Sequence, residues 1–272
     1  MQMIIDRITS TANPKIKEIK ALNQKKDRKK SGLFWAEGIR LVTEAIQTRA
    51  EIDSVIHCPE LLNSKIGNQT VQLAKQLGLQ VVEVSSEVFA SISSREGPQG
   101  LAAVIKERWS TISEIHKKPG YWVGFDSIQD SGNLGSVMRT LEAFGGKGVV
   151  LIGDCADPYQ ANAVRASTGA IFNLDIIKTS IDEFIYWSKN TKIPIIATWI
   201  GRSLHYRKFN YQDNIILLMG SEQKGLRQEL LDICSARVVI PMRGRVDSLN
   251  LACSASIILA EIAAQNEDCD DK

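Results

Sequence analysis

The stretch Ala236–Ala260 reads ARVVIPMRGRVDSLNLACSASIILA and combines two local patterns. Residues 237–242 are mostly β-branched or apolar and contain a proline, which predicts a short buried strand that stops there. From Ser248 onward the spacing becomes helical, with Asp247 or Ser248 as the expected N-cap. The stripe predicted for this helix comprises Leu249, Ala252, Cys253, Ser256, Ile257 and Ala260.

A polar loop with one glycine and two arginines separates the predicted strand from the predicted helix. Free backbone N–H groups and the positive end of the helix dipole meet at such a junction, which favours a ligand-binding edge. The alternative left open by the pattern is an ordinary βα unit that only packs the core.

Residues 121–235 repeat this alternation of apolar runs and helical patterns. Strands are expected at 121–125, 149–152, 193–197 and 214–220. Helices are expected at 133–144 and after Asp157, with Pro158 in the first helical position. Near-continuous apolar strands between helices predict a parallel sheet covered on both faces.

The first 106 residues form a second pattern of short helices and strands, which predicts a small α/β domain. Asn13 and Pro14 mark a helix start, with an apolar stripe at Ile16, Ile19 and Leu22. Further helices are expected at 39–46, 71–77 and 87–92, and strands at 52–56, 79–84 and 100–105. Residues 107–120 are polar and end in Pro119-Gly120, as is typical of a linker.

Composition limits the classes of protein that fit. With 272 residues, 44% of them hydrophobic, the chain can build a sizeable core. Apolar runs stay below the ~18 residues of a membrane span, so no membrane partner is expected. Five cysteines without a C-x-x-C pair and three scattered histidines indicate reduced thiols in the cytoplasm and no metal site.

Charge is concentrated at the N-terminus. Residues 1–30 contain nine basic and three acidic residues, a net charge of +6, which leaves −4 for the rest of the chain. A basic segment of this kind suits a polyanionic partner, because every neutralised phosphate releases counterions. A solvated helix face is the equally weighted alternative.

Polar, glycine-bearing loops follow three of the predicted strands, at 126–139, 220–226 and 241–250. In a parallel sheet such loops meet at the carboxyl edge, where ligands bind. Neither G-x-G-x-x-G after a strand nor a phosphate-cradling G-x-x-x-x-G-K-[ST] occurs. The loops supply Asn, Arg, Glu and Ser rather than a histidine base, a set suited to binding and orienting a substrate.

These loops resemble the three signature motifs of the SpoU (TrmH) family of RNA ribose methyltransferases. Residues 126–145 contain Asn-Leu-Gly and an arginine four residues after that glycine; 218–226 contain Gly-x-Glu-x-x-Gly-Leu; 239–250 contain Ile-Pro-Met and Ser-Leu-Asn. Residues 162–170 and the opening of the chain also resemble family segments. One departure is Ser131-Gly132, where the family usually has a proline beside the motif's aspartate.

The resemblance implies an α/β fold in two parts: a trefoil-knotted parallel-sheet methyltransferase domain at 121–272, and a smaller, ribosomal-protein-like RNA-binding domain at 1–106. It implies S-adenosylmethionine as cofactor and a homodimer. The implied activity is methylation of a ribose 2′-hydroxyl in structured RNA, with ribosomal RNA favoured. A transfer RNA substrate, a non-catalytic RNA-binding module and a small-molecule transferase are the alternatives.

The resemblance also implies roles for individual residues. The catalytic set is Arg139, Asn133, Glu222, Ser248 and Asn250, and the cofactor-binding set is Gly220, Ile240, Met242 and Leu249. Simpler roles are available for each polar residue. Arg139 could form a surface ion pair, the Asn and Ser residues could be helix caps or surface residues, and Glu222 could be a first-turn acid favoured by the helix dipole.

The last helix is expected to take part in the dimer interface. Besides its stripe, it carries Leu251, Ala255 and Ile258 on another face. A helix that is apolar nearly all round needs cover on all sides, and a partner subunit could provide it.

Overall fold

The computed structural model describes residues 7–267. The chain divides into two compact units, Met1–Glu107 with Tyr159–Phe172, and Arg108–Pro158 with Asn173–Lys272. Each unit has its own sheet and its own core. Among the described residues, no helix is both long and apolar enough to cross a bilayer.

The first unit contains a four-stranded sheet in the order β1-β4-β2-β3. Its strands are β1 (Leu33–Glu37), β2 (Ile52–His57), β3 (Val81–Glu83) and β4 (Leu101–Lys106). β4 is antiparallel to β1 and β2, and β2 is parallel to β3. The helices from the N-terminal part are α1 (Pro14–Ala21), α2 (Lys25–Ser31), α3 (Ile39–Gln47), α4 (Lys65–Gln76) and α5 (Ser86–Ile92).

Helix α1 forms as its sequence predicts. The side-chain oxygen of Asn13 accepts a hydrogen bond from the backbone N–H of Lys15 at 2.9 Å, and Pro14 follows the cap. Ile16, Ile19 and Leu22 are buried in the core of the first unit. The cap and the apolar stripe therefore fix the helix together.

A segment from the later part of the chain belongs to the first unit by its contacts. Within it α8 spans Ala161–Ser167, and the ring of Phe34 lies 4.8 Å from Tyr159 between centroids. The predicted helix start at Asp157-Pro158 is wrong. The helix begins after Gln160, because Pro158 lies in a turn that is not continued as a helix.

The second unit contains seven strands in the order β7-β6-β5-β10-β8-β11-β9, and all neighbours are parallel. They are β5 (Tyr121–Asp126), β6 (Gly148–Ile152), β7 (Asp175–Thr179), β8 (Ile195–Thr198), β9 (Leu204–His205), β10 (Ile215–Gly220) and β11 (Ala236–Val239). This confirms the predicted α/β class and parallel sheet. The strands β7 and β9 were not predicted. β9 has only two residues, whereas β7 has five, as many as the predicted β6.

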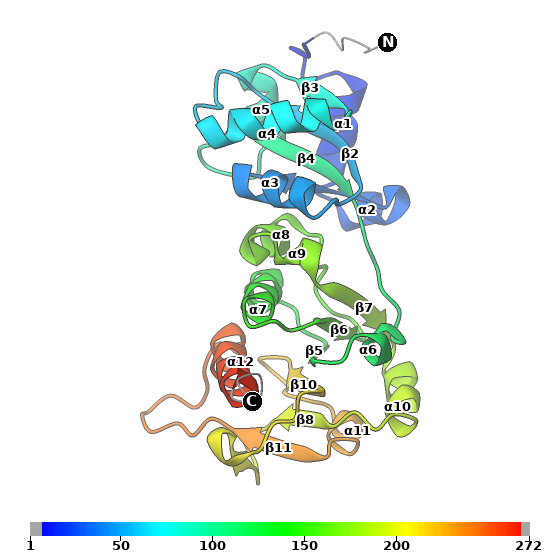
Figure 1. Ribbon diagram of the computed structural model, residues 1–272, viewed down its shortest axis with the longest axis vertical. Helices are drawn as coiled ribbons and strands as arrows, with labels where there is room; N and C mark the ends of the chain where they lie inside the picture. The colour runs from blue at the N-terminus through cyan, green and yellow to red at the C-terminus, as the bar shows by residue number, and fades with distance from the viewer. Residues whose placement is uncertain (1–6, 268–272) are drawn as a thin grey trace. The chain divides into compact units, whose positions relative to one another are not determined.

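Helices cover both faces of this sheet (Figure 1). On one face lie α7 (Ser131–Ala143) and α12 (Leu251–Glu267); on the other lie α6 (Glu114–Lys117), α10 (Ile181–Lys189) and α11 (Gln228–Leu231). Trp122 and Phe184 are fully buried in the core beneath the second group of helices. Because both faces are covered, the central strands are apolar on both sides, as the sequence indicated.

Helix α12 is buried on a different face from the one predicted. Leu251, Ala255 and Ile258 are buried, whereas Cys253 and Ala260 of the predicted stripe are exposed. Leu251, Ala255 and Ile258, which were expected to be covered by a partner subunit, therefore pack within the chain. The reason is that α12 packs against α7, with a contact of 3.1 Å between the hydroxyls of Thr140 and Ser256.

The strand order determines which loops are neighbours. β10 lies between β5 and β8, and β8 lies between β10 and β11. Since the strands are parallel, their carboxyl ends lie side by side at one edge. Four loops distant in sequence therefore meet there, and they form the carboxyl edge described next.

Candidate active site

Asn133 connects the three loops that the sequence singled out. Its side-chain N–H donates to Oε1 of Glu222 at 2.7 Å, and its side-chain oxygen accepts from Nδ2 of Asn250 at 3.0 Å. A carboxylate only accepts hydrogen bonds, so Glu222 fixes which way the Asn133 amide faces. The three side chains form one chain of hydrogen bonds across the carboxyl edge.

Helix α7 holds Asn133 in place at its first turn. Asp130 caps the helix, because its Oδ1 accepts from the backbone N–H of Asn133 at 2.7 Å. The helix thus begins at Ser131, two residues before the predicted start. Asn133 is therefore not the cap, and its amide is free to face the neighbouring loops.

Asn250 is the cap of α12, and this corrects the prediction of Asp247 or Ser248. Its Oδ1 accepts from the backbone N–H of Ala252 at 2.8 Å and of Cys253 at 3.3 Å. Its backbone oxygen accepts the first bond of the helix, from Ser254 at 2.9 Å. The loop is longer than expected, because β11 ends at Val239 instead of continuing to residue 242.

The loop after β10 is a tight turn that carries Glu222. Ser221 forms a bridge with Gly225, and its hydroxyl accepts from the backbone N–H of Lys224 at 3.3 Å. Gly220 permits this turn, since a Cβ there would lie 2.1 Å from the backbone carbon of Gly225. Glu222 is exposed at the tip, and among the described residues its Oε2 accepts no hydrogen bond.

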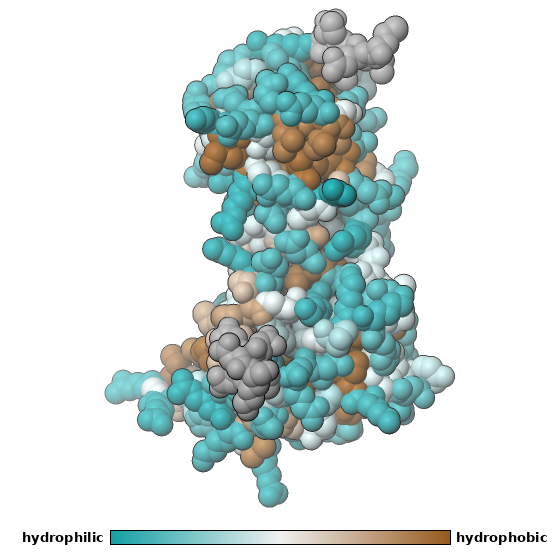
Figure 2. Space-filling model, viewed as in Figure 1, coloured by the Kyte–Doolittle hydropathy of each residue, from teal (hydrophilic) through white to brown (hydrophobic). Residues whose placement is uncertain are grey.

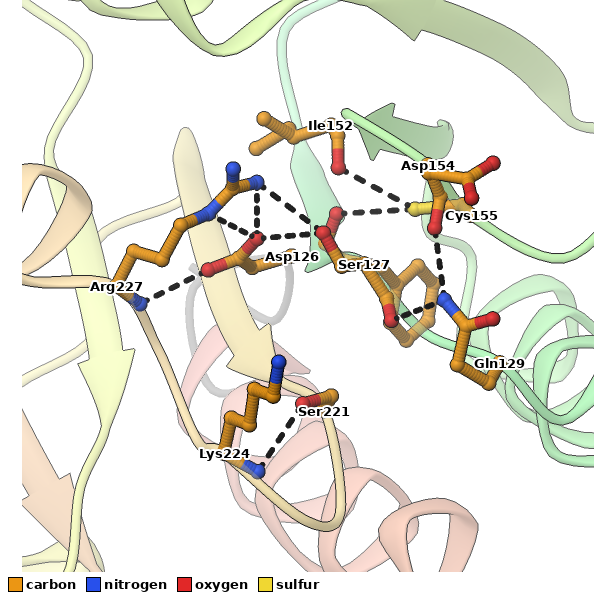
Figure 3. A network of polar contacts seen from close by, with 10 residues as sticks. Asp126, Ser127, Gln129, Ile152, Asp154, Cys155, Ser221, Lys224 and Arg227 are labelled. Atoms are coloured by element: carbon orange, nitrogen blue, oxygen red, sulfur yellow. Dashed lines mark hydrogen bonds and ion pairs between the residues drawn. The ribbon is translucent and has the colours of Figure 1, made fainter.

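An ion pair between a buried aspartate and an exposed arginine joins the first and second loops at their bases (Figure 3). Asp126, at the end of β5, is 2% exposed and accepts from the backbone N–H and the Nε of Arg227, each at 2.9 Å. Nη2 of Arg227 also donates to this carboxylate and to the hydroxyl of Ser127. These bonds raise the pKa of the Arg227 guanidinium above its ordinary value.

Sequence reasoning missed this pair. Asp126 follows a strand and Arg227 lies 101 residues further on, so only the pairing of β5 with β10 brings them together. The signal that could have found the pair is an acid at the first position of one recognised motif and an arginine directly after another.

The first loop is fixed by further contacts at its base. Ser127 has a positive φ of 56°, which is uncommon for a residue other than glycine. Nε2 of Gln129 donates to the backbone oxygens of Ser127 and Asp154 at 2.9 and 2.8 Å (Figure 3). Burial raises the pKa of the Cys155 thiol above its ordinary value.

Two residues of the predicted catalytic set lie apart from this chain of hydrogen bonds. Arg139 is exposed on α7, six residues or about 9 Å along the helix from Asn133. Ser248 is exposed in the loop before α12. Within the described residues neither side chain has a hydrogen bond or an ion pair, so both are free to meet a substrate or another molecule.

Of the residues predicted to bind the cofactor, Gly220 ends β10, Ile240 and Met242 follow β11, and Leu249 directly precedes the cap of α12. Gly220, Ile240 and Met242 are half-buried, and Leu249 is 37% exposed. Because β8 lies between these two strands, its loop must line any ligand that spans them. That loop contains the half-buried Trp199 and the 76% exposed Ile200, which sequence reasoning also missed.

This part of the edge fits a nucleoside with an attached amino-acid chain. Apolar side chains at Ile240, Met242 and Leu249 are left partly open, beside loops with backbone hydrogen-bonding groups. In the described part of the chain, no three His, Cys, Asp or Glu side chains lie together as a metal site.

Comparison with protein families gives two matches. Residues 121–260 match the family described as the SpoU rRNA Methylase family. Residues 13–103 match the MRM3-like substrate binding domain. The two regions correspond to the sheet with its carboxyl edge and to the four-stranded sheet of the first unit.

Individual proteins are similar over nearly the whole chain. A 23S rRNA guanosine 2′-O-methyltransferase of Bacillus subtilis, RlmP, is 27% identical over 93% of this chain and 97% of its own. A 23S rRNA uridine 2′-O-methyltransferase of Streptomyces viridochromogenes is 26% identical over 95% and 92%. The AdoMet-bound crystal structure of an rRNA methyltransferase from Sinorhizobium meliloti is 34% identical, with a TM-score of 0.86 over 96% and 97%.

The observed cap of α12 gives a direct test of the site. We expect Asn250→Ala to lower the free energy of unfolding by about 1 kcal/mol, because two backbone N–H groups lose their acceptor. Ser248→Ala is the matched control and should leave the free energy of unfolding unchanged. Chemical denaturation of both variants measures the difference. Equal losses would mean that the cap is not at Asn250.

Proposed function

The chain belongs to the SpoU rRNA methylase family, and from this premise we propose that it transfers a methyl group from S-adenosylmethionine to a ribose 2′-hydroxyl of ribosomal RNA. The observation that carries the proposal is the hydrogen-bonded set Asn133, Glu222 and Asn250 at the carboxyl edge. A non-catalytic RNA-binding module would not need these three loops held together. The rRNA-modifying relatives favour ribosomal over transfer RNA.

Gly220, Ile240, Met242 and Leu249 would hold the cofactor, mainly through backbone groups and apolar contacts. The cofactor supplies an electrophilic methyl group. The chain's own task is to position the ribose hydroxyl and to stabilise charge on its oxygen. Glu222 and Asn133 offer a carboxylate oxygen and an amide for positioning, and Asn250 holds the amide in place.

We assign the stabilisation of charge to Arg139, with Ser248 as a further polar contact to the substrate. A guanidinium is effectively always protonated, so Arg139 orients the hydroxyl and stabilises the developing alkoxide, while the hydroxyl proton passes to water rather than to Arg139. Its exposure without a protein partner in the described chain supports this role, because the cation is available to RNA.

We also propose that the active form is a homodimer built in part on α12. The outward side of this helix carries Ala252, Cys253, Ile257 and Ala260, and the loop before it exposes Val246 and Leu249. Figure 2 shows brown and pale surface beside α12 and this loop. Apolar surface of this kind favours association with a second copy.

The proposal extends to the trefoil knot and to the domain boundaries. The segment 240–250 connects β11 to α12, and its last residue, Asn250, donates to Asn133 of α7. Residues 1–106 would bind RNA, 107–120 would link, and 121–272 would carry out methyl transfer. A cytoplasmic location fits an enzyme that acts on rRNA; the four cysteines in the described chain are free.

Loss of the Arg139 guanidinium tests the reaction. We expect Arg139→Ala to lower methyl transfer at least ~100-fold, the scale of removing one preorganised electrostatic group. Binding of S-adenosylmethionine should stay in the micromolar range, roughly −8 kcal/mol. Tritium transfer to ribosomal RNA and calorimetry measure these two quantities. Full activity would exclude Arg139 from the mechanism, and absence of cofactor binding by the wild-type chain would contradict the proposed function.

Mixed dimers test whether two subunits share a site. Gly220→Trp should block the cofactor, because any side chain there meets the backbone of Gly225. If arginine and cofactor come from different subunits, mixing this variant with Arg139→Ala gives one site with both changes and one intact site. Such dimers should regain up to about half of wild-type activity. No recovery after proven subunit exchange would place each site within one chain.

Helix α2 carries four of the exposed cations of the basic N-terminal segment. Lys25, Lys26, Lys29 and Lys30 of α2 are exposed, whereas Arg28 is 3% exposed and donates to the backbone oxygen of Leu22 at 2.7 Å. We expect reversal of the four lysines to glutamate to weaken RNA binding and to reduce the salt slope by up to about three.

Filter binding at several salt concentrations measures this effect. Reversal of Lys65 and Lys75, which are exposed on α4 in the same unit, is the control and should change the slope less. Cofactor binding should survive in both variants. An unchanged slope would show that the lysines of α2 are only a solvated face.

A further inference from the structure

Arg227 donates most of the hydrogen bonds that the carboxylate of Asp126 accepts. Both of its oxygens accept hydrogen bonds from Arg227, one from the backbone N–H and the other from the guanidinium, and Ser127 donates to the second oxygen at 3.1 Å. Burying a carboxylate is costly unless it is paired and hydrogen-bonded. The position of Arg227 is therefore set by the end of β5.

Arg227 directly follows the 221–226 turn, which carries Glu222. The turn begins at Gly220 and is closed on itself by the bridge between Ser221 and Gly225. Leu226 is buried, and Arg227 follows as the cap residue of α11. With one end in the sheet and the other held by Asp126, the turn has little freedom, and the carboxylate of Glu222 faces the amide of Asn133.

We propose that Arg227 is a positioning residue for methyl transfer, which acts by holding the 221–226 turn so that Glu222 orients Asn133. The inference rests on the proposed function of this edge. Arg227 does not itself touch the Asn133 chain of hydrogen bonds; it acts through Glu222. Figure 3 shows its guanidinium directed at Asp126 and Ser127, on the side of the turn away from Lys224.

The residues around the Arg227 side chain favour a guanidinium over another cationic group. A Cβ on Gly153 would lie 2.9 Å from Nη2 of Arg227, and Gly153 has a positive φ of 75°. Ser127 keeps its left-handed backbone conformation with its hydroxyl between Asp126 and Arg227. A lysine could supply the charge here but could not make the forked contact.

The same unit contains a matched ion pair at the opposite edge of the sheet. Asp175, at the start of β7, is paired with Lys118, and the cations of the two pairs are similarly exposed, 49% for Lys118 and 42% for Arg227. Both aspartates are buried. Lys118→Gln therefore removes a comparable ion pair without touching the loops of the carboxyl edge.

The test compares Arg227→Gln, Arg227→Lys and Lys118→Gln in a methyl-transfer assay with ribosomal RNA. We expect Arg227→Gln to lower kcat by about tenfold or more, with S-adenosylmethionine affinity and melting temperature changed no more than in Lys118→Gln. Arg227→Lys should restore only part of the loss. Equal kcat values for Arg227→Gln and Lys118→Gln would overturn the proposal.

A double-mutant cycle examines whether Arg227 acts through Glu222. In a Glu222→Gln background, Arg227→Gln should lower kcat by less than about twofold further, because residues that act through one another are not additive. Full additivity would overturn the proposal.

A readout without activity separates this inference from the proposed function. The side-chain ¹⁵N–¹H signals of Asn133, assigned with Asn133→Asp, should move in Arg227→Gln and stay in Lys118→Gln. Unmoved signals would show that Arg227 does not position the turn. Absent methyl transfer by the wild-type chain together with moved signals would contradict the proposed function alone.

Discussion

The side-chain amide of Asn133 is the contact on which the geometry of the site depends. One amide offers a donor and an acceptor on opposite sides, and here they meet Glu222 and Asn250. These partners belong to loops 89 and 117 residues away in the sequence. Because the one planar amide of Asn133 forms the hydrogen bonds to both Glu222 and Asn250, moving any of the three loops breaks a hydrogen bond to another loop.

The parallel sheet makes this arrangement possible. Strands buried on both faces must be apolar throughout, so polar residues are left to the loops at their ends. The order β5-β10-β8-β11 then places these polar loops side by side. The ion pair of Asp126 with Arg227 joins two of them beneath the exposed chain of hydrogen bonds. The buried carboxylate of Asp126 thus supports the loops that carry the exposed polar residues. Residues without a protein partner in the described chain, such as Arg139, lie where an RNA can reach them.

In the first unit, some cationic side chains form hydrogen bonds within the protein and others are exposed to water. Arg28 is buried and binds a backbone oxygen, and Lys15 donates to Gln80 at 2.7 Å. The net charge of the segment therefore overstates the cations that a polyanion could meet. The four lysines of α2 and Lys17 of α1 are exposed. Sequence patterning predicted the basic segment, but only packing determined which cations face water.

Much of the fold followed from local pattern. Apolar runs predicted five of the seven strands in the second unit, and the cap at Asn13 predicted α1, because both effects act over a few residues. The family motifs marked the loops of Asn133, Glu222 and Asn250 by residue type and spacing. Short strands such as β9 gave too few residues for any period to be recognised.

By itself the sequence determined the α/β class, the parallel sheet and the polar loops that end its strands. Only the tertiary structure decided how the loops meet, which face of α12 is buried, that Asn250 caps this helix, and that Arg227 pairs with Asp126. The physical reason is that strand order and helix packing bring together residues about a hundred positions apart. Local propensity carries no information over that distance, since it depends on neighbours within one or two turns.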